Sequence, residues 1–201
     1  MALKVYGHRI SEPSRAVIIF CKINRIDFEE IQVEVLKGQQ FSKEYGAITP
    51  MRQIPAIVDG HLKLIESHAI LIHLCCSFPG VASHWYPGDP QKRAKIHSIL
   101  DWHHSHLRRG AGDGSFLGGS SQPSIADLSL SCEVMQLELL SEEDYHRILS
   151  PYKKVKKWIE DVRNATTPYF DEIHEYLFEY QKRIREQMAT QSGKNKVRAK
   201  M

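Results

Sequence analysis

Long apolar runs are missing from this sequence of 201 residues. A helix that crosses a membrane needs about 18 to 20 consecutive apolar residues, and no run approaches that length. The N-terminus MALKVYGHRI also lacks the apolar core of a secretory signal peptide. We therefore expect no membrane-spanning segment and no membrane partner, and the sequence predicts a cytoplasmic protein.

A large excess of one charge is missing too. The formal net charge is +3, and much of the positive excess lies in the segment from Lys182 to Lys200. A basic face that binds nucleic acid usually carries a larger and more concentrated positive charge. We therefore expect no nucleic-acid partner.

Cysteine is scarce, with four residues in the chain. They lie in apolar surroundings, and their spacing is unlike that of metal ligands. The sequence predicts reduced core thiols and no metal site, while oxidation sensing at the neighbouring pair stays open. The four residues are Cys21, Cys75, Cys76 and Cys132.

Strand patterns occur only in the first part of the chain. The order of strand and helix patterns there is β-α-β-α-β-β-α, whereas everything beyond Gln91 has helical periodicity. We expect an α/β domain over residues 1–82, an all-α domain over 89–185 and a basic, disordered tail over 186–201. The predicted strands are LKVYG, FEEIQVEV, IPAIV and LKLIE, and the helices of this part include AVIIFCKIN and SHAILIHL.

The segment that begins at Ile54 and Pro55 carries the most informative pattern. Proline cannot donate to a sheet ladder, so we interpret Ile54-Pro55 as a candidate cis bond that leaves the backbone of Ile54 free to pair with an extended peptide. Glu66 and Ser67 lie where a strand ends and an apolar helix begins. Backbone N–H groups at a helix start attract a carboxylate. Together these features suit a small anionic peptide.

Several segments together resemble the glutathione transferases of the theta class, and the plant-type members most closely. The similarity covers about residues 1–180 and includes SEPSRAVIIFCK, IPAIVDG, LKLIESHAILIHL, HWYPGDPQKRAKIHSILDWHH and QPSIADLSLSCE. The resemblance implies a thioredoxin-like N-terminal domain that binds glutathione and a helical C-terminal domain that helps to build the electrophile pocket. It also implies a homodimer that needs no cofactor besides glutathione as co-substrate. The implied reactions are conjugation to hydrophobic electrophiles, as in detoxification, and reduction of organic hydroperoxides, as in a peroxidase.

The resemblance implies that the first serine of S-x-P-S-R, Ser11, is catalytic. A thiolate is the reactive form of a thiol, and a hydroxyl donor near a helix N-terminus favours that form. The other interpretation of Ser11 is an N-cap of the following helix, with Ser14 as the competing cap. For Arg15, beside this motif, we favour a structural role over one that orients the site.

The resemblance also assigns the rest of the glutathione site. The residues implied to meet the glycyl end, the cysteinyl backbone and the γ-glutamyl end are, in that order, Gln40 with Gln53, then Ile54, then Glu66 with Ser67. Gln53 departs from the family, which usually has lysine there. Losing that cation weakens carboxylate binding by about 1 to 3 kcal/mol unless Arg52 compensates.

The chain is shorter than the resemblance requires between two helical segments. Members of the family carry a few dozen residues where this chain runs from LRRGA through GDGS into FLGG. We expect the helical domain to be shortened near residues 110–115, with exposed apolar surface and a weakened dimer. The alternative is a glutathione-binding or protein-interaction module with little or no turnover.

Two further patterns in the sequence are weaker evidence of a site or a signal. His97, Asp101 and His104 lie at i, i+4 and i+7 on one face of a helix, either as metal ligands or as a partly buried polar seam, and we favour the seam. The last three residues, Ala199-Lys200-Met201, resemble the tripeptide of peroxisomal import. They are either such a signal or the end of a solvated basic tail.

Overall fold

The computed structural model describes residues 2–105 and 122–198 of the chain. The predicted shortening near residues 110–115, the side chain of His104 and the tripeptide Ala199-Lys200-Met201 lie outside the part whose side chains are described. No helix within the described part is long and apolar enough to cross a membrane.

Four strands form one mixed sheet. Their order across the sheet is β2-β1-β3-β4, and β1 pairs with β2 in parallel and with β3 antiparallel. A parallel pair needs a crossover, and helix α1 (Glu12–Ile23) supplies it. The strands are β1 (Leu3–Gly7), β2 (Phe28–Gln32), β3 (Ala56–Asp59) and β4 (Leu62–Ile65).

The other helices belong to the N-terminal part or build a helical layer. The N-terminal part adds the short α2 (Lys43–Gly46) and α3 (Ser67–Ser77), with 3₁₀ turns η1 (Val35–Lys37) and η2 (Gln39–Phe41). The predicted order β-α-β-α-β-β-α is confirmed. The helical layer consists of α4 (Pro90–Ser105), α5 (Ile125–Val134), η4 (Met135–Leu139), α6 (Glu142–Leu149), α7 (Lys153–Ala165) and α8 (Tyr169–Arg198).

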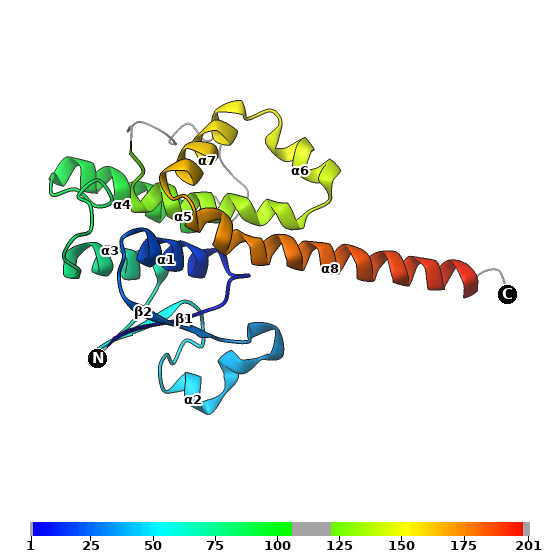
Figure 1. The fold of residues 1–201 in the computed structure, drawn as a ribbon, viewed down its shortest axis with the longest axis horizontal. Coiled ribbons are helices and arrows are strands. Elements are labelled where there is room, and N and C mark those ends of the chain that lie inside the picture. Colours follow the sequence, from blue (N-terminus) through cyan, green and yellow to red (C-terminus); the bar gives the residue numbers. More distant parts are fainter. Residues whose placement is uncertain (1, 106–121, 199–201) are drawn as a thin grey trace.

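Helix α1 lies between the sheet and the helical layer (Figure 1). Its residues 16–21 are all fully buried, because the segment is apolar around its whole circumference. One continuous core cluster therefore runs from Val5 and Ile57 of the sheet, through α1, to Leu128 of α5 and Ile173 of α8. This packing holds the start of α1 fixed against both layers.

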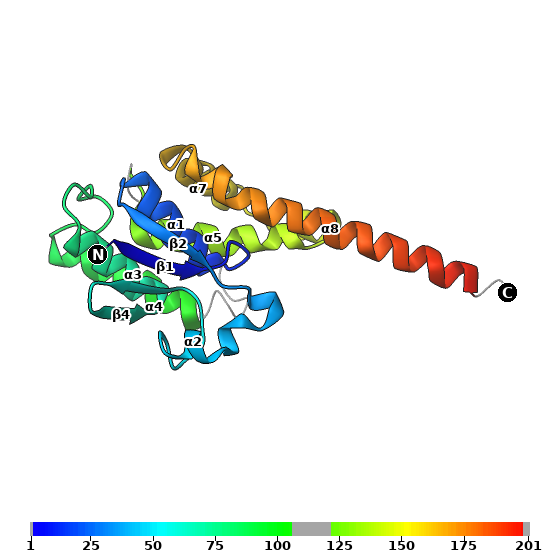
Figure 2. The ribbon, with the colours of Figure 1, turned by 60° about the horizontal axis from the view of Figure 1, so that its bottom comes forward.

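Two predicted segments differ from the structure. Strand β2 ends at Gln32 instead of continuing through residue 35, since Gly38, with φ of 79°, closes 3₁₀ turns that lead the chain away from the sheet. Helix α8 continues to Arg198, whereas the sequence predicts a disordered tail over residues 186–201. Lys, Arg, Gln, Glu, Met and Ala dominate this segment and favour a helix that has already begun. Figures 1 and 2 show α8 projecting beyond the other elements.

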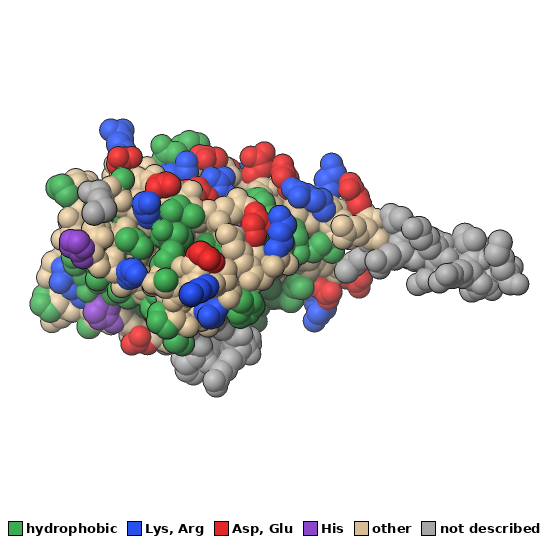
Figure 3. Space-filling view, turned by 90° about the horizontal axis from the view of Figure 1, so that it is seen from below, with side chains coloured by type: hydrophobic (Ala, Val, Ile, Leu, Met, Phe, Trp, Pro, Cys, Tyr) green, Lys and Arg blue, Asp and Glu red, His purple; other side chains and the backbone are tan. Residues whose placement is uncertain are grey.

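Apolar side chains also lie on the surface of the N-terminal part. Figure 3 shows them on the face that holds the strands and α2, with charges of both signs among them. Large exposed apolar side chains in this part of the chain include Leu36, Phe41 and Met51, which are 58%, 67% and 61% exposed. Apolar surface of this kind is a candidate contact for a partner.

Candidate functional site

A cavity of about 380 Å³ opens where the loop before α1, the 3₁₀ turns, the segment before β3 and the start of α3 meet. The structure brings all six site residues predicted from the sequence to its wall. They are Ser11, Gln40, Gln53, Ile54, Glu66 and Ser67, and the wall also includes Glu12, Pro13, Val35, Arg52, Pro55 and Ile65.

Ser11 occupies the N-cap position of α1 by its backbone alone. Its carbonyl accepts from the amide of Arg15 at 3.0 Å, but its side chain makes no capping hydrogen bond. The hydroxyl of Ser14, the competing cap, is buried and has no partner among the described residues. Neither hydroxyl therefore caps the helix. Because the Ser11 residue lines the cavity, its hydroxyl is available to a ligand there.

Arg15 lies fully buried behind Ser11. Its guanidinium donates to the carbonyls of Arg9 and Ile10 at 3.0 and 2.9 Å, which precede Ser11, and to the carbonyl of Cys132 and the side chain of Gln136 on the helical side, both at 2.9 Å. Burial lowers the pKa of Arg15. These contacts support the structural role that we favoured for it.

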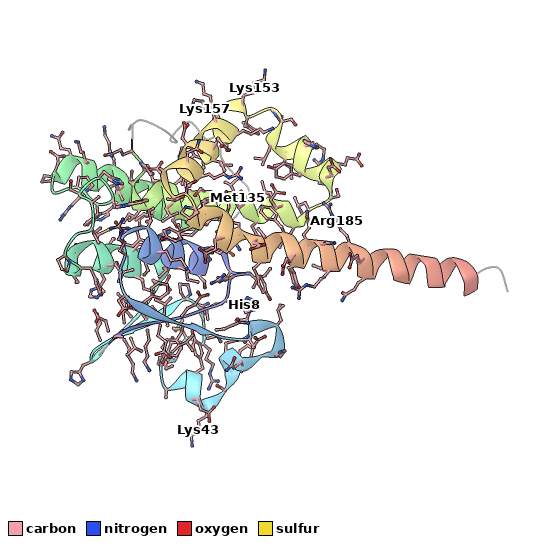
Figure 4. All side chains as sticks on the ribbon, viewed as in Figure 1. His8, Lys43, Met135, Lys153, Lys157 and Arg185 are labelled. Carbon is pink, nitrogen blue, oxygen red and sulfur yellow. The ribbon has the colours of Figure 1, made fainter. Side chains whose placement is uncertain are left out.

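His8 is a residue of this region that sequence reasoning missed. It is buried, and Figure 4 labels its position. Its Nδ1 accepts from the amide of Ile10 at 3.1 Å, and its ring meets Tyr176 of α8 edge-on with centroids 5.1 Å apart. Burial lowers the pKa of His8, against the opposing effect of Glu34. The available signal was a histidine between a strand and the S-x-P-S-R motif.

The Ile54-Pro55 bond is cis, so this candidate is confirmed. Within the described residues, no hydrogen bond involves the backbone amide or carbonyl of Ile54, and sheet pairing begins at Ala56. The neighbouring Gln53 carbonyl accepts from the hydroxyl of Tyr45 at 2.7 Å. Burial raises the pKa of that tyrosine to about 12, so the phenol stays a donor.

Gln40 and Arg52 bring different polar groups to the cavity wall. The Oε1 atom of Gln40 is buried and has no partner among the described residues. Arg52, with φ of 55°, donates to the carbonyls of Phe41 and Ser42 and so holds the turn before α2. It is also the cationic residue of the cavity wall, beside the Gln53 position where a lysine was expected.

Glu66 and Ser67 stand at the start of α3. Glu66 has φ of 66° and ψ of 110°, a conformation that is rare for a residue with a side chain and that clusters at functional sites. Its carbonyl accepts from the amide of Ile70 at 2.9 Å, whereas its exposed carboxylate caps no amide of the helix. Ser67 is buried and begins the helix, so the first amides of α3 are close to the cavity.

Of the predicted polar seam on α4, His97 and Asp101 are exposed. His97 is exposed and bonds to the hydroxyl of Tyr86 at 2.9 Å, while His103 is buried. Within the described residues, no group of three or more histidine, cysteine or carboxylate side chains could hold a metal ion.

The four cysteines are free thiols. Cys21 and Cys132 are buried, as predicted, and burial raises the pKa of Cys132 to about 12. Cys75 is half-buried, with its pKa raised to about 12 by burial. Cys76 is exposed, so the prediction of a core thiol is wrong there, because the end of α3 turns this residue to solvent.

Comparison with known proteins decides the family. The model of the glutathione S-transferase N-terminal domain matches residues 1–75, and that of the C-terminal domain matches residues 83–161. The chain belongs to the glutathione S-transferase family. Glutathione S-transferase T1 of Arabidopsis thaliana is 50% identical over 89% of this chain and 90% of its own length. Theta-1 of Rattus norvegicus is 35% identical over 72% of this chain and 65% of its own.

Solved structures agree with the theta class. A human theta-class transferase in complex with the glutathione conjugate of 1-menaphthyl sulfate has a TM-score of 0.83 and 28% identity, over 94% of this chain and 92% of its own. Human theta-2 in complex with glutathione and an unknown ligand has a TM-score of 0.82 at 28% identity, over 92% and 91%. The chain is a theta-class transferase of the plant type with the thioredoxin-like and helical parts of that fold.

The plant relatives differ from this chain in length. The alignment with T1 spans 220 positions, more than the 201 residues of this chain, so T1 has positions without a counterpart here. This chain also spans 40% of glutathione S-transferase T2 of Arabidopsis thaliana, which is 48% identical to it.

Proposed function

We propose that the cavity binds glutathione and that the Ser11 hydroxyl donates a hydrogen bond to its sulfur. The observation that carries this proposal is the Ser11 hydroxyl, which makes no capping bond and lines the same cavity as the five other predicted residues. A donor beside the sulfur stabilises the thiolate more than the thiol, which lowers the pKa of the bound thiol.

The polar groups of the cavity match the two ends of the tripeptide. The carboxylate of Glu66 meets the γ-glutamyl ammonium, and Ser67 with the first amides of α3 meets the carboxylate beside it. The free backbone of Ile54 pairs with the cysteinyl residue. Gln40 and Gln53 contact the glycyl end, where Arg52 supplies the positive charge.

The thiolate then performs one of two reactions. With a hydrophobic electrophile, a sulfur–carbon bond forms and the leaving group departs with the bonding electron pair. With an organic hydroperoxide, sulfur attacks the terminal peroxide oxygen, the O–O bond breaks and the alkoxide takes a proton. A second glutathione then converts the sulfenic acid to glutathione disulfide and water, so two glutathione molecules are oxidised for each hydroperoxide.

Separate measurements of binding and turnover test this function. We expect calorimetry to detect glutathione binding and steady-state assays to detect conjugation of an aryl halide or reduction of an aromatic hydroperoxide. Ser11→Ala should lose turnover at least tenfold while it keeps most of its affinity, because the hydroxyl acts on the sulfur and not on the ends of the peptide. Ser14→Ala is the matched control, since its hydroxyl bonds to nothing among the described residues.

Binding without turnover would favour the alternative of a glutathione-binding module. A folded chain that binds no glutathione would contradict the proposal and favour an interaction module instead. We also propose a homodimer in the cytoplasm. The alternative location is the peroxisome, with import through Ala199-Lys200-Met201. Deletion of this tripeptide in cells would test the import.

A further inference from the structure

A buried cluster of polar side chains joins the two layers directly behind the start of α3. His68 of α3 has its Nε2 3.1 Å from Nδ1 of His103 on α4 and 3.0 Å from the hydroxyl of Ser129 on α5. The Nε2 of His103 lies 3.1 Å from a carboxylate oxygen of Glu133, one turn further along α5. His68, His103 and Ser129 are 8%, 2% and 3% exposed.

The chemistry of the groups gives this chain of hydrogen bonds a direction. A carboxylate only accepts, so Nε2–H of His103 donates to Glu133. In a neutral imidazole the other nitrogen is then an acceptor, and Nδ1 of His103 takes the Nε2–H of His68. The hydroxyl oxygen of Ser129 lies within hydrogen-bond distance of the same nitrogen of His68. Such a buried network stays ordered because any broken bond leaves a desolvated polar group.

The cluster begins one residue after the candidate site. Ser67 lines the cavity, and the next residue of a helix points about 100° further around the axis, so His68 is directed toward α4 and α5. On the other side of Ser67 stands Glu66 in its left-handed conformation. Glu66 and Ser67 are therefore held between an unusual backbone conformation and a buried side-chain anchor.

We propose that His68, His103 and Glu133 are positioning residues, which fix the first turn of α3 so that Glu66 and Ser67 keep their place in the cavity. This inference rests on the proposed binding of the γ-glutamyl end at these two residues. Because the cluster acts on an end of the peptide remote from the sulfur, it affects the affinity for glutathione and leaves the chemical step to Ser11.

Two matched pairs of variants test this inference. An asparagine amide reaches the place of Nδ1 of a histidine, and a glutamine amide reaches that of Nε2. His103→Asn therefore keeps the bond to His68, and His103→Gln loses it. At position 68 the order is reversed, because His68 uses Nε2, so His68→Gln keeps the bond and His68→Asn loses it.

The readouts are the calorimetric Kd for glutathione, KM and kcat. We expect His103→Gln and His68→Asn to weaken the Kd and raise KM for glutathione about tenfold, with kcat within twofold of the wild type. His103→Asn and His68→Gln should stay within threefold of the wild-type Kd. His97→Asn, on an exposed position of α4, is the control and should leave all three constants unchanged.

If a variant at one of the two positions does not fold, the pair at the other position still decides the test. Equal Kd values within either folded pair would overturn the inference, and so would a parallel loss of kcat and affinity in the variants that break the bond. A wild-type chain that binds no glutathione would overturn the proposed function itself, and this inference with it. Normal wild-type binding with unchanged variants would overturn the positioning role alone.

Discussion

At the scale of single residues, Arg15 holds the backbone that leads into Ser11. Its guanidinium is fully buried and donates to carbonyls before Ser11 and at the end of α5. Arg15→Met keeps the length of the side chain but leaves these carbonyls without a donor. We expect the free energy of unfolding to fall by about 3 kcal/mol, measured by denaturant titration.

Arg183→Met is the control for this substitution. Arg183 pairs with Glu179 at 3.0 Å on the surface of α8, and both side chains are about 60% exposed. An exposed pair of this kind contributes less than about 1 kcal/mol. Similar losses in the two variants would contradict the structural role of Arg15.

His174 should make the stability of the chain depend on pH. Burial, and then the charge of Arg15, lower its pKa to about 3, while its Nδ1–H donates to the carbonyl of Phe170 at 2.7 Å. In the unfolded chain the pKa is about 6.5, so below that pH the unfolded state binds the proton and the folded state does not. Stability contributed by neutral His174 is therefore present above pH 6.5 and lost as pH falls toward 3.

We expect this group to remove about 1.5 kcal/mol of unfolding free energy between pH 6.5 and 5. His174→Asn should lack that part of the pH dependence, because an amide does not titrate. The measurement is denaturant unfolding at both pH values, with His146→Asn on exposed α6 as the control. An identical pH dependence in wild type and His174→Asn would contradict the argument.

At the scale of elements, a capping box fixes where α5 begins. The Ser124 side chain and amide both bond to the carboxylate of Asp127, whose other oxygen accepts from the indole N–H of Trp158 on α7 at 2.9 Å. Asp127→Ala removes the cap and leaves a buried indole donor without a partner. We expect a loss of about 2 to 3 kcal/mol in unfolding free energy, measured by denaturant titration.

The cap of α6 provides a comparison for this loss. Asp144 also accepts from the hydroxyl of its N-cap residue, Ser141, but this pair lies on the surface, and the other oxygen of Asp144 bonds to Arg147 instead of a buried tryptophan. Asp144→Ala should therefore cost less than Asp127→Ala. Equal costs would contradict the larger contribution that we assign to the bonds of Asp127.

Elements with strong local patterns were predictable from the sequence. The capping box at Ser124, the apolar helix α1 and the strands around Asp59 and Gly60 follow from residue type and spacing. The helical pattern beyond Gln91 does not set the bounds of α6, although Ser141 and Asp144 give a cap signal, because its eight residues bury little apolar surface. The basic composition beyond residue 185 predicts disorder, whereas the segment continues α8, because residues that favour a helix extend one that has already begun.

The site was predictable only in part, because some of its contacts join residues that are far apart in the sequence. Ser11, Ile54 and Glu66 carry local signals of a turn, a proline or a helix start, and the structure places them on one cavity. His68 and His103 carry no such signal. Their bond joins residues 35 positions apart, and sequence spacing does not reveal which of the histidines of α4 faces inward.

At the scale of the whole molecule, residues 1–82 and 89–185 are proposed to act as two domains that share one apolar core. The core cluster runs through α1 into both layers, so neither layer buries its apolar face without the other. The proposed glutathione cavity lies in the N-terminal part, whereas the buried cluster behind it reaches α4 and α5.

The oligomeric state is a property of the whole molecule, and we propose a homodimer. Sedimentation equilibrium should show a mass of twice the 23.1 kDa chain, with dissociation on dilution because we expect a weakened contact. The exposed Leu36, Phe41 and Met51 give the N-terminal part apolar surface for such a contact. A single species with the mass of one chain at all concentrations would contradict the dimer.

The most direct test of the account is the thiolate absorbance of bound glutathione. The chain is titrated with glutathione near pH 6.5, where a free thiol is almost wholly protonated. We predict an ultraviolet thiolate band with the wild type and with Ser14→Ala, and none with Ser11→Ala. A folded wild-type chain without the band, or a band of equal strength in Ser11→Ala, would contradict the claim that the Ser11 hydroxyl stabilises the sulfur.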